Sequence, residues 1–371
     1  MDPRINRWAK TLVQYCLSIQ PGEMLSINAT PAAEDLLAEV CRETLRAGGH
    51  PVVNLALPGL REIALKESSD EQLAWISPAE RALVDSFDAR LHIMSETNTR
   101  QFANVDPEKQ AIQGKAGREL FSARSQRVDP NTDRWCLTLF PTPAYAQDAE
   151  MSLHDFTEFV YEACFLNSDD PAERWRELGR QQQFYVDWLK DKQGAHVIGP
   201  DTDLTVKFGG RIFRNSDGKR NFPSGEFFTS PLEDSAEGHV RFTIPSVVNG
   251  HLVNDIRLTF ERGRVVEARA AQGDDYLRKM LASDDGASRL GEFAIGNNFG
   301  IQRGIRNILF DEKIGGTIHM ALGNSYRECG GKNTSQLHWD MICDLREAAG
   351  GGEVWVDGAL LLKDGKLVLK P

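Results

Sequence analysis

The chain has 371 residues, of which 41% are hydrophobic and 26% charged, and its formal net charge is -11. This composition is typical of a soluble globular protein, and the length favours two domains over one. The acidic balance argues against a nucleic-acid-binding protein, because a phosphate backbone requires a cationic surface. It is compatible with positively charged ligands, such as a metal ion or a free amino terminus.

The sequence contains no targeting or membrane signal. No run approaches the roughly 18 consecutive apolar residues that a membrane span requires. The N-terminal segment MDPRINRWAK lacks the apolar core of a signal peptide. The six cysteines contain no CxxC pair, which favours free thiols in a reducing compartment over a disulfide framework. We therefore expect a cytoplasmic protein that does not enter a membrane.

The first 195 residues alternate between predicted helices and strands. Helices are expected at 5–18, from Thr30 to the glycine pair 48–49, at 79–85 and at 108–127. Strands are expected at 24–28, 51–57, 90–94 and 135–140. Because consecutive strand–helix–strand units form right-handed crossovers, this order predicts a mostly parallel sheet. An aromatic-rich helical stretch follows at 152–192. No GxGxxG or P-loop motif occurs at the turns, so a phosphate-binding site is not predicted.

From residue 196 the pattern becomes rich in strands. They are expected at 196–199, 203–208, 240–248, 255–260 and 265–270, with hairpin turns at Asn249-Gly250 and Arg262-Gly263. A helix is expected at 274–282, and two strand pairs close the chain. The sequence thus predicts an α/β domain with a mostly parallel sheet at 1–195. An α+β, strand-rich domain that binds metal is predicted at 196–371.

The segment 311–340 contains the densest group of side chains that could bind a metal. His338 and Asp340 are two residues apart, so on a strand both side chains point to the same face. His319 lies in a second strand-like run, which Gly323 ends. Imidazole and carboxylate groups that meet from separate strands suit a borderline divalent cation such as zinc.

Two glutamates outside this segment have unusual neighbours. Glu226 lies between a glycine and two phenylalanines, and Glu292 lies between a glycine and an apolar run. Burying an unpaired carboxylate is costly, so each should have a cation or strong hydrogen-bond donors beside it. Taken alone, each could also be an ordinary partnered glutamate or one at a strand edge.

Together these residues fit a site for two cations, in which one carboxylate bridges metals roughly 3.5–4 Å apart. Such a pair activates a shared water and polarises a carbonyl, and a nearby tyrosine can stabilise the oxyanion or help to hold a metal. Glu312 is a further candidate, although a surface salt bridge with Lys313 explains it equally well. No GxSxG or HExxH motif supports another hydrolase class. The candidate set is Glu226, Glu292, Glu312, His319, Tyr326, His338 and Asp340.

Four segments of the second half resemble the aminopeptidase T and aminopeptidase S family of dinuclear metallo-aminopeptidases. They are NFPSGEFFTSP around Glu226, LGEFAIG around Glu292, IHMALGNSY around His319 and Tyr326, and NTSQLHWDMI around His338 and Asp340. They follow one another in the order of the family, whereas the first half resembles it only in length and element pattern.

The resemblance implies an enzyme that removes N-terminal residues from short peptides and uses two divalent cations (zinc, cobalt or manganese). It also implies a homodimer whose N-terminal domains wall the active site. Its metal ligands would be the candidate set, with Glu292 and Tyr326 also catalytic. Glu312 matches a family acid less closely, because its spacing to His319 varies among members.

Two alternatives remain at this point. Relatives of the family resemble ring-cleaving dioxygenases of hydroxylated pyridines, which use one iron held by two histidines and a carboxylate. This chain keeps both glutamates and Tyr326, which a single-iron site does not need. The metal count separates the two, because two ions per chain favour the peptidase and one iron favours the oxygenase. A binding protein with a decayed site is the third possibility, and the intact set of ligand residues argues against it.

Overall fold

The computed structural model describes residues 2–125, 133–248 and 250–370. The chain divides into two compact units, Met1–Ala172 with Lys219–Phe222, and Glu173–Gly218 with Pro223–Pro371. Residue 195, near which the domain boundary is predicted, lies at the start of β5 (Gly194–Gly199), and most of the preceding helix α9 (Pro171–Leu189) belongs to the second unit.

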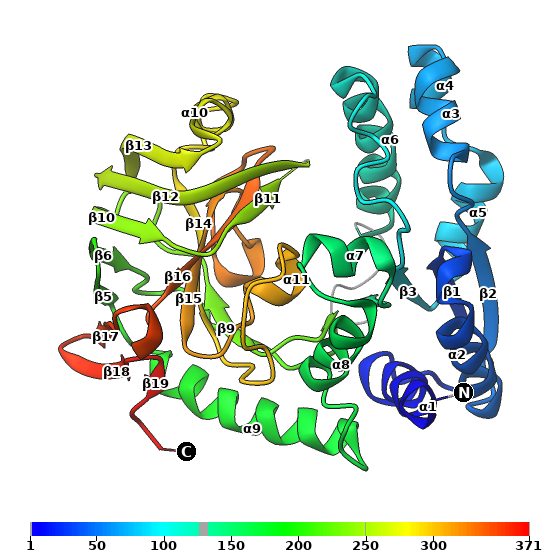
Figure 1. Cartoon of the computed structure of the whole chain (residues 1–371), viewed down its shortest axis with the longest axis horizontal. Coiled ribbons are helices and arrows are strands. Elements are labelled where there is room, and N and C mark those ends of the chain that lie inside the picture. Colours follow the sequence, from blue (N-terminus) through cyan, green and yellow to red (C-terminus); the bar gives the residue numbers. More distant parts are fainter. Residues whose placement is uncertain (1, 126–132, 249, 371) are drawn as a thin grey trace. The chain divides into compact units, whose positions relative to one another are not determined.

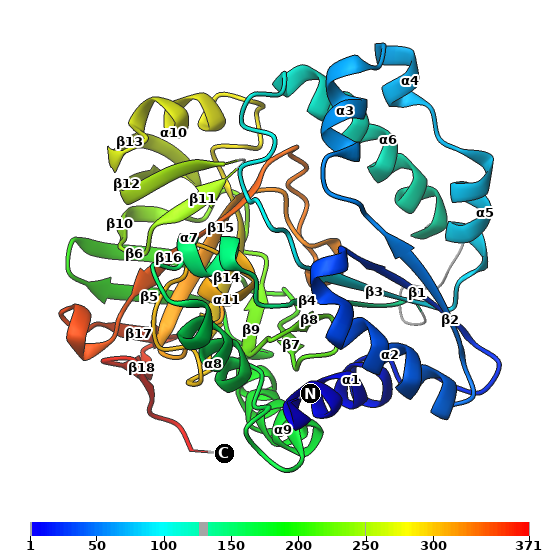
Figure 2. The same cartoon turned by 45° about the vertical axis from the view of Figure 1, so that its right-hand side comes forward.

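The first unit is built on a five-stranded parallel sheet with the order β2-β1-β3-β4-β8 (Figures 1 and 2). Its strands are β1 (Met24–Ala29), β2 (His50–Leu55), β3 (Ala89–Met94), β4 (Arg134–Leu139) and β8 (Asn221–Phe222). Its helices are α1 (Pro3–Lys10), α2 (Glu34–Arg46), α3 (Leu60–Glu67), α4 (Asp70–Ala74), α5 (Pro78–Ser86), α6 (Pro107–Ser125), α7 (Pro143–Asp148) and α8 (Leu153–Ala163). Helices connect the successive parallel strands, so the predicted fold class of this half is confirmed.

The predicted helices of the first unit differ from the observed ones in detail. The helix expected at 5–18 consists of α1 followed by a π-helical turn at Thr11–Cys16. The helix expected at 108–127 is α6, which is described to Ser125, and its last two predicted residues lie outside the described part. Thr30 is an N-cap as predicted, since its side chain accepts a hydrogen bond from the Ala32 N–H, but it caps a short 3-10 turn that precedes α2.

The second unit contains α9 (Pro171–Leu189) and two largely antiparallel sheets (Figure 1). A nine-stranded sheet has the order β11-β12-β10-β6-β5-β17-β18-β19, with β13 paired to β12. Its members are β5 (Gly194–Gly199), β6 (Thr202–Lys207), β10 (Glu237–Phe242), β11 (Ser246–Val248), β12 (His251–Glu261), β13 (Arg264–Gln272), β17 (Glu353–Val356), β18 (Ala359–Lys363) and β19 (Lys366–Leu367). The strand expected at 240–248 is interrupted because Pro245, which has no N–H to donate, separates β10 from β11. Asn249 of the predicted turn lies outside the described residues.

The five-stranded sheet of the second unit has the order β16-β15-β14-β9-β7. Its members are β7 (Arg214–Ser216), β9 (Glu226–Thr229), β14 (Leu290–Gly296), β15 (Thr317–Gly323) and β16 (His338–Asp344). Two helices, α10 (Asp274–Leu281) and α11 (Ile308–Asp311), complete the unit. The prediction of a strand-rich second half is confirmed.

The core of the second unit lies between its two sheets. Every second residue of β15, namely Ile318, Met320 and Leu322, belongs to this core, as does Trp339 of β16. Because successive side chains of a strand point to opposite faces, the residues between them face away from the core cluster. His319, His338 and Asp340 are such intervening residues, so the hydrophobic alternation itself places them together on one face of the sheet.

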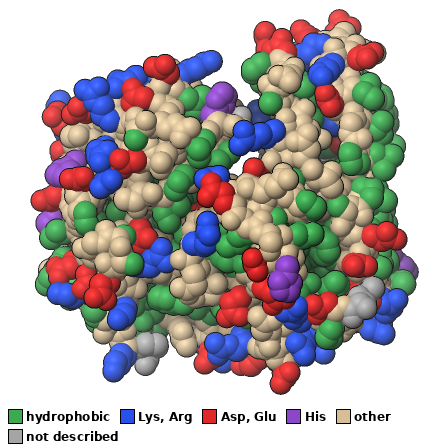
Figure 3. All heavy atoms as spheres, in the orientation of Figure 1, with side chains coloured by type: hydrophobic (Ala, Val, Ile, Leu, Met, Phe, Trp, Pro, Cys, Tyr) green, Lys and Arg blue, Asp and Glu red, His purple; other side chains and the backbone are tan. Residues whose placement is uncertain are grey.

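Surface properties agree with the composition. On the face shown in Figure 3, acidic and basic side chains are interspersed and no large patch of one sign is visible. None of the helices in the described part of the chain combines the length and apolar character that a bilayer crossing demands. The six cysteines, all within the described residues, form no disulfide bond.

Candidate metal centre

Three neighbouring strands bring the centre of the site together. Glu226 begins β9, Glu292 lies in β14 and His319 lies in β15. In the register of the sheet, Glu226 pairs with Gly296 and His319 pairs with Ala294. A β-bulge between Leu290 and Glu292 shifts the pairing of β14 with β15 next to Glu292. Glu226 and Glu292 are 66 positions apart along the chain, and Glu292 and His319 are 27 apart, so the three residues become neighbours only through the sheet order.

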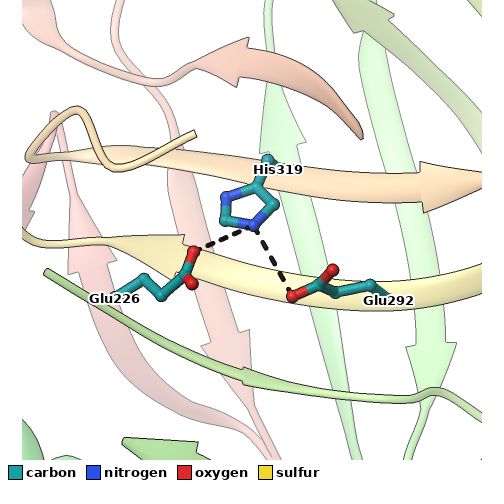
Figure 4. Close-up of side chains that lie close together, drawn as sticks. All are labelled: Glu226, Glu292 and His319. Carbon is teal, nitrogen blue, oxygen red and sulfur yellow. Dashed lines mark ion pairs between the residues drawn. The ribbon is translucent and has the colours of Figure 1, made fainter. Parts of the chain in front are cut away.

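His319 lies between the two glutamates (Figure 4). Its Nε2 atom is 3.2 Å from Glu226 Oε2 and 3.7 Å from Glu292 Oε1. All three side chains are buried. This is the first of three groups whose ligand atoms lie within 4.8 Å of one another.

His338 also faces the carboxylate of Glu292, at its second oxygen. Its Nε2 atom is 3.3 Å from Glu292 Oε2 and 3.5 Å from Asp340 Oδ1. The other ring nitrogen, Nδ1, is 2.8 Å from the backbone oxygen of Asn324, to which it can only donate. That hydrogen bond fixes the tautomer and orients Nε2 toward the carboxylates, as is common for metal-binding histidines. Glu292 therefore directs one oxygen to each histidine.

Glu312 joins the cluster from the loop between α11 and β15. It forms the third group together with His319 and Asp340. Its predicted surface salt bridge with Lys313 exists as an ion pair but lies inside the protein, since Lys313 is only 1% exposed. The same ammonium is 2.6 Å from Glu226 Oε1. Sequence reasoning treated this lysine only as a surface partner, because a lone Lys beside an acid is usually solvent-exposed.

Tyr326 lies beside the cluster and outside the three groups. Its hydroxyl is 3.4 Å from His338 Nε2, and its ring packs on Phe228 with 4.9 Å between the ring centroids. The negative charge of Glu292, together with burial, raises the pKa of this phenol well above its ordinary value. It is therefore a neutral hydrogen-bond donor.

The charges of the cluster shift one another strongly. Burial lowers the pKa of His338, but Asp340 and Glu292 outweigh it and raise that pKa to about 12. The pKa of His319 is likewise raised well above its ordinary value, by Glu226 and Glu292 acting against burial. Burial raises the pKa of Glu312 to about 8, despite the opposing effect of Lys313. Such strong shifts are typical of functional sites.

The atoms of these residues suit the binding of divalent metal. Glu226 Oε2, His319 Nδ1 and Asp340 Oδ1 are buried and have no hydrogen-bond partner among the described residues. Buried polar atoms without partners are rare in proteins and require an explanation. The ligand atoms on offer are carboxylate oxygens and imidazole nitrogens with no thiolate, which suits zinc, cobalt or manganese. Glu292 belongs to two of the three groups.

The segment before His338 is held by a carboxylate that sequence reasoning did not single out. Asp284 accepts hydrogen bonds from Gly286 N–H and Ala287 N–H at 2.9 Å through Oδ1. Through Oδ2 it accepts from the Ser335 hydroxyl at 2.8 Å and the Gln336 N–H at 2.9 Å. Burial raises the pKa of Asp284, but these hydrogen bonds outweigh it and leave the pKa below its ordinary value of 3.8.

We expect Asp284→Asn to lower the free energy of unfolding by about 1–3 kcal/mol at neutral pH, because it removes charge-assisted hydrogen bonds. A carboxyl group with a depressed pKa contributes stability above its unfolded pKa and loses it as the pH falls through the folded pKa. The difference between the two proteins should therefore shrink below about pH 4. Urea unfolding at several pH values measures it. Asp285→Asn is the matched control, since that exposed neighbour only pairs with Arg264 and should change stability little.

Comparisons with known proteins show the family and the fold of the chain. The model of the thermophilic metalloprotease (M29) family matches residues 1–366. Aminopeptidase 2 of Geobacillus stearothermophilus is 30% identical over 98% of this chain and 96% of its own length. The structure of wild-type AmpT from Thermus thermophilus superposes with a TM-score of 0.84 and 25% identity, over 99% of each chain. A 2,5-dihydroxypyridine dioxygenase from Pseudomonas putida KT2440 superposes with a TM-score of 0.62 and 15% identity over 99% of this chain and 98% of its own, which is a likeness of fold alone.

Proposed function

We propose a function from one premise: the chain belongs to the thermophilic metalloprotease (M29) family. Membership makes it a metal-dependent peptidase, and the relative with 30% identity is named an aminopeptidase. The enzyme is therefore a metallo-aminopeptidase. In finer detail, we propose that it removes N-terminal residues from short peptides at a site for two divalent cations, zinc, cobalt or manganese.

The position of Glu292 carries the proposal of two cations. Its Oε1 faces His319 at 3.7 Å and its Oε2 faces His338 at 3.3 Å, so its two oxygens are directed to different imidazoles. Glu292 would therefore be shared between two cations. Glu226 and His319 would hold one of them, and His338 and Asp340 would hold the other. Glu312, which lies near His319 and Asp340, is the remaining candidate ligand.

Divalent cations bound there would lower the pKa of a water and polarise the scissile carbonyl. Side chains of the protein would supply the proton transfer and the stabilisation of the developing negative charge. Glu292 can accept a proton from the attacking water, and the neutral Tyr326 hydroxyl can donate a hydrogen bond to the oxygen on which negative charge develops. A carboxylate of the cluster or a bound cation would hold the amine at the free end of a peptide, which would favour exopeptidase over endopeptidase cleavage.

The dioxygenase alternative receives no comparable support. A site with one iron needs two histidines and one carboxylate. Such a site would leave Glu226 and Glu312, both directed at the same cluster, without a ligand role. The likeness to the dioxygenase concerns the fold and does not extend to its chemistry.

Metal content and cleavage pattern together test the proposed function. Protein purified without added metal and then equilibrated with zinc should contain two ions per chain by elemental analysis. Incubation with an unmodified peptide should give a ladder of products shortened from the amino end, as measured by mass spectrometry. The same peptide with an acetylated amine is the control and should stay intact. One iron per chain, or cleavage inside the acetylated peptide, would contradict the proposal.

Three expectations stay predictions: a homodimer, a cytoplasmic location and a domain boundary near residue 195. The first of them rests on the family resemblance, and the mass of the protein in solution tests it directly.

A further inference from the structure

A buried lysine lies among the carboxylates of the metal centre and has no part in the chemistry described above. The side chain of Lys313 is 1% exposed. Its ammonium is 2.6 Å from Glu226 Oε1 and also pairs with Glu312. Lysine is almost never fully buried unless it is paired, so these two contacts explain how the protein tolerates the charge.

The main chain of Lys313 is held beside the cluster. The Lys313 N–H donates to the Phe310 oxygen at 2.9 Å, and the Lys313 oxygen accepts from the Asn298 N–H at 3.0 Å. Together with the burial of the side chain and its two carboxylate partners, these hydrogen bonds place the positive charge inside the site.

The two oxygens of Glu226 are divided between two different neighbours. Oε1 faces Lys313 at 2.6 Å, whereas Oε2 faces His319 at 3.2 Å and accepts no hydrogen bond from the part of the chain that the structure describes. The lysine thus occupies the oxygen on one side of the carboxylate and leaves the other oxygen for a cation held by His319.

We propose that Lys313 is a resident counter-cation of the metal centre. It holds Glu226 and Glu312 in place when the divalent cations are absent, and it weakens the binding of those cations by electrostatic repulsion. This inference rests on the proposed two-cation function. Four carboxylates meet in the cluster, and Lys313 adds a positive charge to those of the two histidines, which offsets the mutual repulsion of the carboxylates in the metal-free site. Once divalent cations are bound, the same charge opposes them.

Lys313→Met keeps much of the side-chain volume and removes the charge, so its effects report the role of the charge and not of the packing. Metal-free Lys313→Met should unfold at a temperature lower by on the order of 5 °C or more, because it leaves buried carboxylates without their partner. Its affinity for Co²⁺ should be tighter by about tenfold or more, because a repulsive charge is gone. Thermal unfolding in the presence of a chelator measures the first effect. Competition with a chromophoric chelator, together with the cobalt absorption bands, measures the second.

Two further variants complete the test. Lys363→Met is the matched control, since it removes an exposed lysine that pairs with Glu353 at 2.9 Å, and it should change neither quantity. In a Glu226→Gln background the loss of metal-free stability caused by Lys313→Met should be smaller, because the carboxylate that lies 2.6 Å from the ammonium has already been replaced by a neutral amide. If Lys313→Met alone folds poorly, a double variant that folds better would still support the proposal.

The possible failures can be distinguished. If the unsubstituted chain binds no Co²⁺, the proposed two-cation function is wrong. If it binds Co²⁺ normally and Lys313→Met binds it with equal or weaker affinity, only the inference about Lys313 is overturned. Equal effects of Lys313→Met with and without Glu226→Gln would overturn it as well.

Discussion

Glu292→Gln is expected to lower kcat/KM for an aminoacyl-p-nitroanilide by on the order of 10³-fold or more. The substitution keeps the size of the side chain but removes the negative charge that faces both His319 and His338. An amide neither bridges two cations well nor accepts a proton from water. The bound metal should also fall from two ions toward one per chain, which elemental analysis measures beside the kinetics.

The control must show that lost activity does not come from lost folding. Glu261→Gln, at the exposed end of β12, makes the same chemical change away from the cluster and should leave kcat/KM unchanged. Circular dichroism should show that Glu292→Gln stays folded, with some loss of stability because His319 and His338 lose a charged partner. Full activity with two ions bound in Glu292→Gln would remove this carboxylate from the proposed mechanism.

The parts of the fold that could be predicted from the sequence are those with a regular apolar period. In β15 the alternation of Ile318, His319 and Met320 identifies both the strand and the face on which the histidine lies. The same alternation places His338 and Asp340 on one face, because they lie two residues apart on a strand. The short helices α3 and α4 were not predicted, because α3 exposes Leu60 and Ile63 and so has no continuous apolar stripe.

The composition of the site could be predicted only in part from local pattern. Glu226 and Glu292 lie in strands that pair directly, yet no local period indicates which distant strands become neighbours. Their place in the candidate set came from the resemblance to a family, together with the cost of burying a carboxylate. Lys313 could not be placed in this way, because its burial depends on the glutamates that surround it in the folded chain. Asp284 acts through a hydrogen-bonded loop, for which the sequence carries no distinct signal.

Removal of the divalent cations by a chelator is expected to reduce peptidase activity by on the order of 10³-fold or more, while the protein stays folded. Without the cations, the remaining groups can orient a peptide but cannot polarise its carbonyl strongly. Folding should persist because Lys313 and the two histidines still face the carboxylates. Activity should return on addition of zinc, cobalt or manganese, and the ratio of added metal to protein at full recovery should be two.

The pH of the reconstitution provides the sharpest check, because a ligand must release its proton before it binds a metal. Protons and cations therefore compete for His319 and His338, whose neighbouring carboxylates raise the pKa of each imidazole in the metal-free protein. Recovery should need more metal as the pH falls, and binding should release protons, which calorimetry in buffers of different ionisation enthalpy measures. Magnesium is the control, since it prefers oxygen ligands and keeps its waters, and it should restore less activity than zinc. Activity that survives complete removal of metal would contradict a metal-dependent mechanism at this face of the sheet.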